Sequence, residues 1–214
     1  VLATTVWGNS ASWSLAALPL FIWMGEILFR TRLSEEMFRG FAPWLNWLPG
    51  RLMHVNVLAC GVFGSVSGSS AATCATVAKI ALPELKKRGY NEDLSLGSLA
   101  GAGTLGILIP PSITMILYGI ATETSIGRLF LAGVLPGILL VLLFAVYAGF
   151  AARRAGDAAG VARQTYTLGE KVEGLARVLP FVAIVVAVAY AMYGGLASPS
   201  EVAALAAALA LALV

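Results

Sequence analysis

The sequence predicts an all-α polytopic membrane protein, and three observations carry this prediction. Hydrophobic residues make up 59% of the 214 residues and charged residues only 12%, against roughly a quarter charged in an ordinary soluble domain. The mean hydropathy is +0.86. Five stretches lack Asp, Glu, Lys and Arg altogether, and each holds the roughly 20 residues that a helix needs to cross a bilayer: 1–25, 52–78, 94–122, 129–152 and 178–200.

Charge and cysteine content exclude several other classes of protein. The net charge is only +3, so no nucleic acid partner is implied. Cys60 and Cys74 lie in apolar runs without the spacing of a metal site or a disulfide framework. The apolar stretches hold no His, Asp or Cys constellation for catalysis. We therefore expect a protein of the lipid bilayer that is not an enzyme and carries no cofactor.

The two ends of the sequence predict that the chain is an internal piece of a longer protein. No initiator Met or signal peptide opens the chain. The last apolar segment, from Val202, continues to the final residue, Val214.

Basic residues gather in three clusters that the positive-inside rule places together in the cytoplasm. Two spans separate the second cluster from the third, which returns the chain to the same side as the rule requires. The clusters are Arg30, Arg32, Arg39 and Arg51; Lys86, Lys87 and Arg88; and Arg153, Arg154, Arg163, Lys171 and Arg177.

The stretch between Arg51 and Lys86 predicts a re-entrant helical hairpin. Two full spans would need about 40 residues, more than this stretch holds, and a single span would put the second basic cluster outside. Gly and Ser crowd its middle, where they favour turns and caps. We expect half-helices over about 51–66 and 70–87, with a tip near 67–70 that lines a site, because unpaired backbone is not tolerated in lipid.

The next span predicts a broken helix. Pro111 lacks an N–H and its ring disfavours the helical conformation at Pro110, so one half-helix should end near Gly106 and another begin near Pro111. Two interrupted elements in adjacent segments are typical of a midplane binding site in a secondary transporter.

The remaining elements follow in order along the chain. Thr31–Pro49 resembles an amphipathic arm on the cytoplasmic interface, with Phe38, Phe41, Trp44 and Trp47 as anchors or contacts to a small partner. Glu201 and the cap residue Ser198 start the last helix, with Pro199 in its first turn. The other predicted elements are a span over 15–29, an uninterrupted span over 129–150, a polar loop over 153–177 and a span over 178–193.

These residues resemble the large membrane subunit (DctM-like) of TRAP transporters, the tripartite ATP-independent periplasmic transporters. The matching motifs recur in order over nearly the whole chain, with small departures at Cys74, Ser198 and Ser200. The main motifs are Gly61–Thr73, Ile80–Glu84, Arg88–Tyr90, Gly103–Ser112, Thr124–Gly127, Leu129–Gly133 and Ser198–Ala203.

The resemblance implies an elevator-type transporter built from two inverted repeats, each with one hairpin and one broken helix. This chain would hold the first repeat and the opening of the second. It would comprise a scaffold span and arm (1–50), a transport-domain part (51–122), a span and cytoplasmic loop (123–177) and spans opening the second repeat (178–214). The implied partners are a small membrane subunit (DctQ-like) and a periplasmic solute-binding protein (DctP-like) at a bacterial inner membrane.

Candidate ligands for Na⁺ lie at the hairpin tip and at the break. Hard cations prefer oxygen, and helix C-termini carry partial negative charge. Since charged side chains are absent from these stretches, Na⁺ is preferred to H⁺ as the coupling ion. The alternative to ion binding is that these small residues only allow tight helix packing. The candidates are Ser67, Gly68, Ser69 and Ser70 on one wall, and Gly103, Thr104 and Gly106 on the other.

A carboxylate-bearing solute, such as a C4-dicarboxylate or sialic acid, is the expected cargo. Two exiting half-helices aim backbone N–H groups into the same region, although Ser70 and Ser112 can equally be plain helix caps. The candidate substrate contacts are Ser70, Thr73, Pro110, Pro111 and Ser112. The alternative functions are a divalent-anion:Na⁺ symporter that needs no binding protein, and a purely structural membrane subunit.

Overall fold

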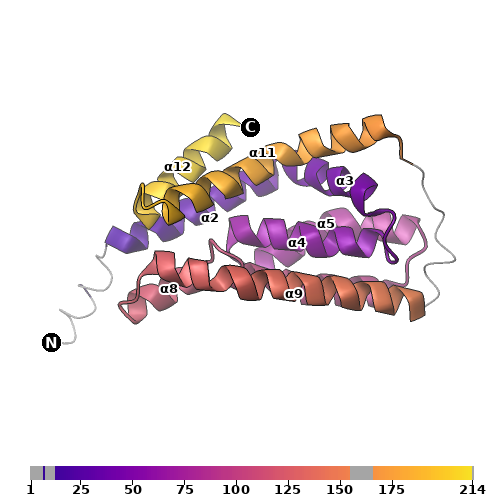
Figure 1. Ribbon diagram of the computed structural model, residues 1–214, viewed down its shortest axis with the longest axis horizontal. Helices are drawn as coiled ribbons and strands as arrows, with labels where there is room; N and C mark the ends of the chain where they lie inside the picture. The colour runs from indigo at the N-terminus through magenta and orange to yellow at the C-terminus, as the bar shows by residue number, and fades with distance from the viewer. Residues whose placement is uncertain (1–6, 8–12, 155–165, 214) are drawn as a thin grey trace.

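The helices of the computed structural model form two layers that lie side by side along the long axis of the molecule (Figure 1). The structure describes Trp7, residues 13–154 and residues 166–213, so Arg163 and the middle of the predicted polar loop lie outside the described residues. Every regular element in these ranges is helical. The elements are η1 (Trp13–Ala16), α2 (Ala17–Arg30), α3 (Leu33–Leu45), α4 (Leu52–Ser67), α5 (Ser70–Lys87), α6 (Glu92–Gly103), α7 (Leu105–Leu108), α8 (Ile113–Ala121), α9 (Ile126–Arg154), α11 (Leu168–Tyr193) and α12 (Pro199–Ala212).

The first layer contains α2, α3, α11 and α12, with α12 packed on α2 and α11 on α3. The second layer contains α4 to α9, and α4 is the helix through which it mainly meets the first layer. Three segments are long and apolar enough to cross a membrane: Glu92–Ala121, which includes the break, α9 and α11. With α4 and α12 as shorter apolar helices, the composition and the fold agree on a membrane protein.

The predicted helical hairpin is present as α4 and α5, which pack against each other. At 1.5 Å per residue, arms of 16 and 18 residues extend about 24 and 27 Å, short of a full 30 Å hydrocarbon layer. The span expected over 129–150 is also continuous and extends to the whole of α9, with Pro136 inside it.

Local signals in the sequence set several helix starts. The Glu201 carboxylate accepts a hydrogen bond from the N–H of Ser198 at 2.7 Å, and Pro199 occupies the first turn of α12, as predicted. Thr167 and Glu170 form the same kind of reciprocal cap at the start of α11.

The amphipathic arm is a helix, α3, but its apolar face is covered by protein. Phe38 is 3% exposed and packs in the core, so its predicted role as an interface anchor is wrong. Gly40 and Gly174 lie in backbone contact where α3 crosses α11; a Cβ at Gly40 would come within 2.5 Å of the Gly174 carbonyl oxygen. Trp44 and Trp47 do remain exposed, at 46% and 74%.

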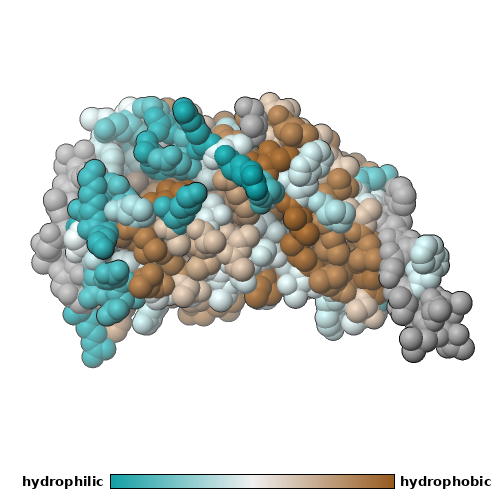
Figure 2. Space-filling model, turned by 180° about the vertical axis from the view of Figure 1, so that it is seen from behind, coloured by the Kyte–Doolittle hydropathy of each residue, from teal (hydrophilic) through white to brown (hydrophobic). Residues whose placement is uncertain are grey.

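The basic clusters meet at one end of the molecule. In Figure 1 the C-terminal ends of α5 and α9 and the start of α11 lie at the same end. Arg39 and Arg88 line one small pocket there, and a Cβ at Gly50 would contact Ala152, next to Arg153. Figure 2, which shows one face, has hydrophilic side chains gathered at this end and continuing along the upper part to the middle of the molecule, with apolar side chains over much of the rest. This is the arrangement that the positive-inside rule requires.

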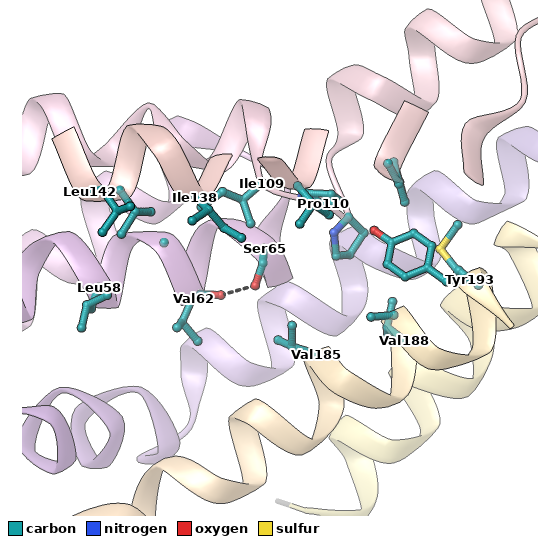
Figure 3. Close-up of a pocket in the computed structure, with 17 residues that line it drawn as sticks. Leu58, Val62, Ser65, Ile109, Pro110, Ile138, Leu142, Val185, Val188 and Tyr193 are labelled. Atoms are coloured by element: carbon teal, nitrogen blue, oxygen red, sulfur yellow. Dashed lines mark hydrogen bonds between the residues drawn. The ribbon is translucent and has the colours of Figure 1, made fainter. Parts of the chain in front are cut away.

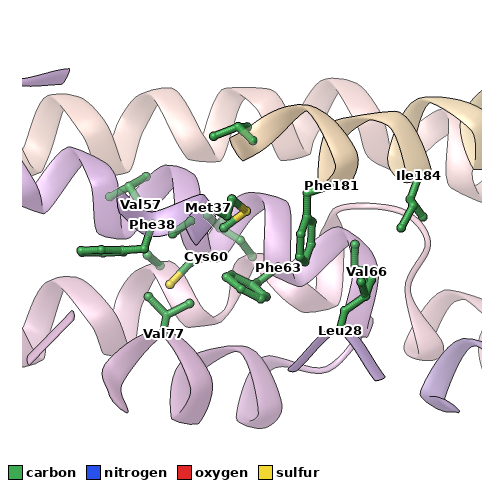
Figure 4. Close-up of a cluster of buried hydrophobic side chains, with 14 of the residues drawn as sticks. Leu28, Met37, Phe38, Val57, Cys60, Phe63, Val66, Val77, Phe181 and Ile184 are labelled. Carbon is green, nitrogen blue, oxygen red and sulfur yellow. The ribbon is translucent and has the colours of Figure 1, made fainter. Parts of the chain in front are cut away.

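Phe63 of α4 joins the two layers (Figure 4). It is fully buried, and its ring lies 5.5 Å from that of Phe29 in α2 and 5.1 Å from that of Phe181 in α11. Aromatic pairs at such distances add to the packing energy of the rings. The ring therefore fixes the position of α4 against the first layer.

We predict that Phe63→Ala destabilises the complete protein by about 3–5 kcal/mol, the usual range for removing a buried aromatic ring. Phe150→Ala is the matched control, since Phe150 is 58% exposed on α9. Thermal unfolding of both variants in detergent, followed by intrinsic fluorescence, measures the difference. Equal transition temperatures for the two variants would contradict the conclusion that the Phe63 ring holds α4 against the first layer.

Candidate functional site

The hairpin reverses direction at Gly68 and Ser69. Gly68 adopts a left-handed conformation (φ +59°), and its N–H donates to the Gly64 carbonyl, which ends α4 in the usual glycine manner. Ser69 begins the return, since its hydroxyl accepts a hydrogen bond from the Ala72 N–H at 3.4 Å. The tip predicted near 67–70 is confirmed as a turn.

The predicted break is also present, a few residues later than expected. Helix α6 ends at Gly103, one further turn (α7) ends at Leu108, and α8 begins at Ile113. Pro110 and Pro111 remove the N–H groups that the carbonyls of Gly106 and Ile107 would use in a continuous helix. The buried hydroxyl of Ser112 replaces one of them, donating to the Ile107 carbonyl at 2.6 Å.

The tip and the break lie against each other through their backbones. The Ile113 N–H, at the start of α8, donates to the Gly68 carbonyl at 3.4 Å. A Cβ at Gly64 would come within 2.7 Å of the Gly106 Cα. A Cβ at Gly106 would come within 3.0 Å of the Ser69 carbonyl oxygen. Glycine is therefore required sterically where the two elements touch.

A cluster of buried oxygen atoms lies at this contact. The hydroxyls of Ser67 and Thr73, from opposite arms of the hairpin, are 2.8 Å apart. The Ser67 oxygen lies 3.2 Å from both the N–H and the carbonyl oxygen of Ser69. Ser67 is 4% exposed and Thr73 fully buried. A Cβ on the facing Gly106 would lie 3.1 Å from the Thr73 hydroxyl, so this face of the break borders the cluster.

Helix ends dominate the electrostatics of this region. The sequence places no charged residue between Leu52 and Ala78 or between Leu94 and Thr122. The C-terminal end of α4 contributes partial negative charge, and the N-terminal ends of α5 and α8 contribute partial positive charge. A cation and an anion can therefore find separate favourable positions at one locus.

The structure brings most of the predicted site residues together and leaves others apart. Thr104 is exposed, and its hydroxyl donates to the Gly101 carbonyl of its own helix, away from the oxygen cluster. Gly103 packs on Cys74, and Pro110 lines an apolar groove that Pro111 also borders. Ser70 is half-buried as the first residue of α5. The residues that do meet at the tip and the break are Ser67, Gly68, Ser69, Thr73, Gly106, Pro111 and Ser112.

Two contacts to the tip were not anticipated from the sequence. Helix α2 approaches it at Gly25, where a Cβ would come within 3.2 Å of the Ser67 Cα. Ile113 contributes its backbone N–H, and its side chain also lies beside Gly68. The Gly25 contact could have been suspected from the sequence, because a glycine inside an apolar helical stretch often marks close packing. No property of the Ile113 side chain indicates that its backbone N–H bonds the tip.

Comparison of the sequence with known proteins places the chain in a family. The family model of the tripartite ATP-independent periplasmic transporter, DctM component, matches residues 1–214. The C4-dicarboxylate TRAP transporter large permease protein DctM of Pseudomonas aeruginosa is 36% identical over 206 residues, which is 96% of this chain and 48% of that protein.

Relatives with other named solutes are similar too. The ectoine TRAP transporter large permease protein TeaC of Halomonas elongata is 34% identical over 89% of this chain and 44% of its own length. The sialic acid TRAP transporter large permease protein SiaM of Vibrio cholerae is 30% identical over 70% of this chain and 35% of its own. The chain thus spans about half the length, or less, of the curated relatives it matches.

We predict that Gly64→Ala destabilises the complete protein whereas Gly97→Ala does not. Both glycines lie inside helices, where alanine is intrinsically favoured by about 1 kcal/mol. A Cβ at Gly64 meets the Gly106 backbone, but a Cβ at Gly97 meets nothing within 4 Å. Thermal unfolding should therefore shift down for the first variant and stay equal or rise for the second. A parallel response of the two variants would show that the tip and the break do not touch.

Proposed function

Since the chain belongs to the DctM family of TRAP transporter large permease components, we propose that it forms part of a Na⁺-coupled secondary transporter that imports a carboxylate-bearing organic solute. In this proposal a periplasmic binding protein delivers the solute, and a small membrane subunit completes the assembly in a bacterial inner membrane. The transporter moves its solute without chemical change.

The observation that carries the proposal is the contact between the hairpin tip and the helix break. Oxygen ligands suit Na⁺, and the contact offers the hydroxyls of Ser67 and Thr73 and the carbonyl of Ser69. The Gly106 carbonyl is a further candidate, because Pro110 cannot donate to it. We assign these four oxygens to the ion, together with the negative end of α4.

The solute carboxylate fits the N-terminal ends of the half-helices. The first N–H groups of a helix have no intrahelical acceptor, and those of Ser70 and Ala71 head α5 beside the tip. Helix α8 starts at the same place, as its Ile113 bond to Gly68 shows. The solutes named for three relatives (C4-dicarboxylates, ectoine and sialic acid) carry a carboxylate, which supports this class of cargo. The isethionate named for another relative carries a sulfonate, a different oxyanion that the same helix N-terminal ends would suit.

The two layers suggest how the site moves. We assign α4 to α9 to a moving transport domain and α2, α3, α11 and α12 to a static scaffold. The basic end faces the cytoplasm in this assignment. The turns before α9 and α12 then face the periplasm, where they share a pocket that includes Glu123, Ser125 and Pro199 and offer a surface to the binding protein.

We predict that Ser67→Ala and Thr73→Val raise the Na⁺ concentration for half-maximal uptake by about tenfold each, because a lost ligand worth about 1.4 kcal/mol changes an affinity tenfold. The assay uses proteoliposomes with the complete subunit, its small partner and its binding protein, supplied with labelled succinate, ectoine or sialic acid. Ser65→Ala is the matched control, since its hydroxyl bonds the Val62 carbonyl within α4.

Three other outcomes of this uptake assay would each contradict one part of the proposal. Na⁺-driven uptake that does not need the binding protein would favour a divalent-anion:Na⁺ symporter. Uptake driven equally well by a proton gradient, with both hydroxyl variants unchanged, would refute the ion assignment. A complex that takes up none of these solutes under any gradient would refute the proposed transport of carboxylates.

A further inference from the structure

The two layers meet in different ways along the length of the molecule. Beside the break an apolar groove separates them, with Leu58 and Val62 of α4 on one side and Val185 and Val188 of α11 on the other (Figure 3). Apolar contacts are non-directional, so they do not specify how far one layer has moved along the other. At the basic end the layers meet through polar side chains, whose hydrogen bonds depend closely on position.

In the second layer, Arg88 at the end of α5 is held by its own helix. Its Nε and Nη2 lie 2.8 and 2.6 Å from the same carboxylate oxygen of Glu84. The Arg88 side chain is 22% exposed, whereas the arginines of the three other ion pairs between described residues are 39% to 81% exposed. The turn that follows is fixed as well, because the Leu52 N–H donates to the Tyr90 hydroxyl at 3.4 Å. The guanidinium therefore has a defined position in its layer.

In the first layer, Tyr166 is held at the start of α11. It directly precedes Thr167, which caps this helix together with Glu170. The start of α11 is fixed on α3, because the Trp44 indole N–H donates to the Lys171 carbonyl at 3.0 Å. Tyr166 is half-buried, so its phenol also has a defined position.

These two side chains bond each other across the boundary between the layers. The Arg88 guanidinium donates a hydrogen bond to the Tyr166 hydroxyl oxygen, since a guanidinium offers donors only. Both residues line a pocket together with Glu35 and Arg39 of α3. The ion pair of α3 is complete in itself, with its two charged groups 2.6 Å apart. The bond between Arg88 and Tyr166 is therefore a polar contact that joins α5 to the start of α11.

Sliding of one layer along the other would break this bond. One residue of an α-helix is about 1.5 Å long, and a hydrogen bond is lost beyond about 3.5 Å, so a displacement of a few residues separates the two groups. Opening leaves no charge without a partner, because Arg88 keeps both of its bonds to Glu84. The contact is therefore specific for one register of the layers and can open reversibly.

We propose that Glu84, Arg88 and Tyr166 form a latch, which holds the two layers in the register of this structure and opens each time they slide. The contact belongs to the structure, whereas the sliding rests on the proposed function. The strength of the latch would then set how long the transporter stays in this register.

Single-molecule fluorescence energy transfer tests the latch in the complete subunit with its small partner, reconstituted in vesicles. One dye is attached at Phe150→Cys in α9 and the other at Val172→Cys in α11, because these positions are 58% and 66% exposed and belong to different layers. Cys60 and Cys74 are replaced by alanine so that the dyes react only at the chosen positions. The transfer efficiency then reports the register of the layers.

A matched pair of variants removes one hydroxyl each. Tyr166→Phe should shorten the dwell time in the register of this structure by about tenfold, because a hydrogen bond to a charged group changes an equilibrium by at least about that factor. Tyr190→Phe is the control, since Tyr190 is 71% exposed on the same helix, and its dwell time should equal that of the unaltered protein.

A reversible cross-link tests whether the layers must separate here during uptake. Arg88→Cys together with Tyr166→Cys is treated with a short bifunctional thiol reagent that a reductant cleaves. The cross-linked protein should lose Na⁺-driven uptake and regain it after reduction. The control pair is Trp44→Cys with Lys171→Cys, which joins α3 to α11 within one layer, so its cross-link should leave uptake unchanged.

Equal dwell times for Tyr166→Phe and Tyr190→Phe would overturn the latch, and so would a single constant transfer efficiency in both. Continued uptake by the protein cross-linked between Arg88→Cys and Tyr166→Cys would also overturn it, as would failure of this pair to cross-link where the control pair does. Uptake by the untreated, unaltered protein is measured separately and tests the proposed function. If that uptake is absent, the proposed function fails, while the dwell times still test the latch, because they require no solute.

Discussion

Backbone hydrogen bonding in an uncharged, apolar environment is the constraint on which this structure depends. The hairpin tip and the helix break both interrupt a helix where the sequence supplies no charged side chain, and unpaired N–H and C=O groups in hydrocarbon cost several kcal/mol each. The chain meets this cost by bringing the two interruptions together, so that the Ile113 N–H bonds the Gly68 carbonyl. Such close approach is possible only because Gly64, Gly68 and Gly106 lack a Cβ.

Helix α4 connects this contact to the rest of the fold. Most of its residues are buried, because it packs on α5, α6, α7 and α9 in its own layer and on α2, α3 and α11 in the other. Phe63 joins the layers through its ring, while Leu58 and Val62 face the groove where the layers separate. The same helix therefore holds the tip in place and borders the groove between the layers.

The sequence was sufficient for the hairpin turn, the break and the continuous helix α9 because each has a local cause. Gly68 and Ser69 form a turn by their own conformational preferences, and Pro110 and Pro111 break a helix whatever surrounds them. Two other expectations were wrong in their bounds or length. The polar loop predicted over 153–177 is helical from Leu168 onward, and the span predicted over 15–29 is the 14-residue helix α2, too short to count among the segments that can cross a membrane. The burial of Phe38, the outward position of the Thr104 hydroxyl and the approach of Gly25 to the tip have no such local cause. They depend on which helices pack together across long sequence separations, and periodicity within one helix does not specify its partner.

The oxygen cluster at the tip satisfies its own hydrogen bonds without an ion, and this has a consequence for the proposed transport. The hydroxyls of Ser67 and Thr73 share one hydrogen bond between the two arms of the hairpin. For both oxygens to face a cation, the hydrogen between them must rotate away, because a hydroxyl binds a cation through its lone pairs. A bound Na⁺ would therefore replace one bridge between the arms with a stronger, charged one. Ion binding would stiffen the tip beside the N-terminal ends of α5 and α8, where the solute carboxylate is proposed to bind. Bound Na⁺ would then lower the entropic cost of binding the solute.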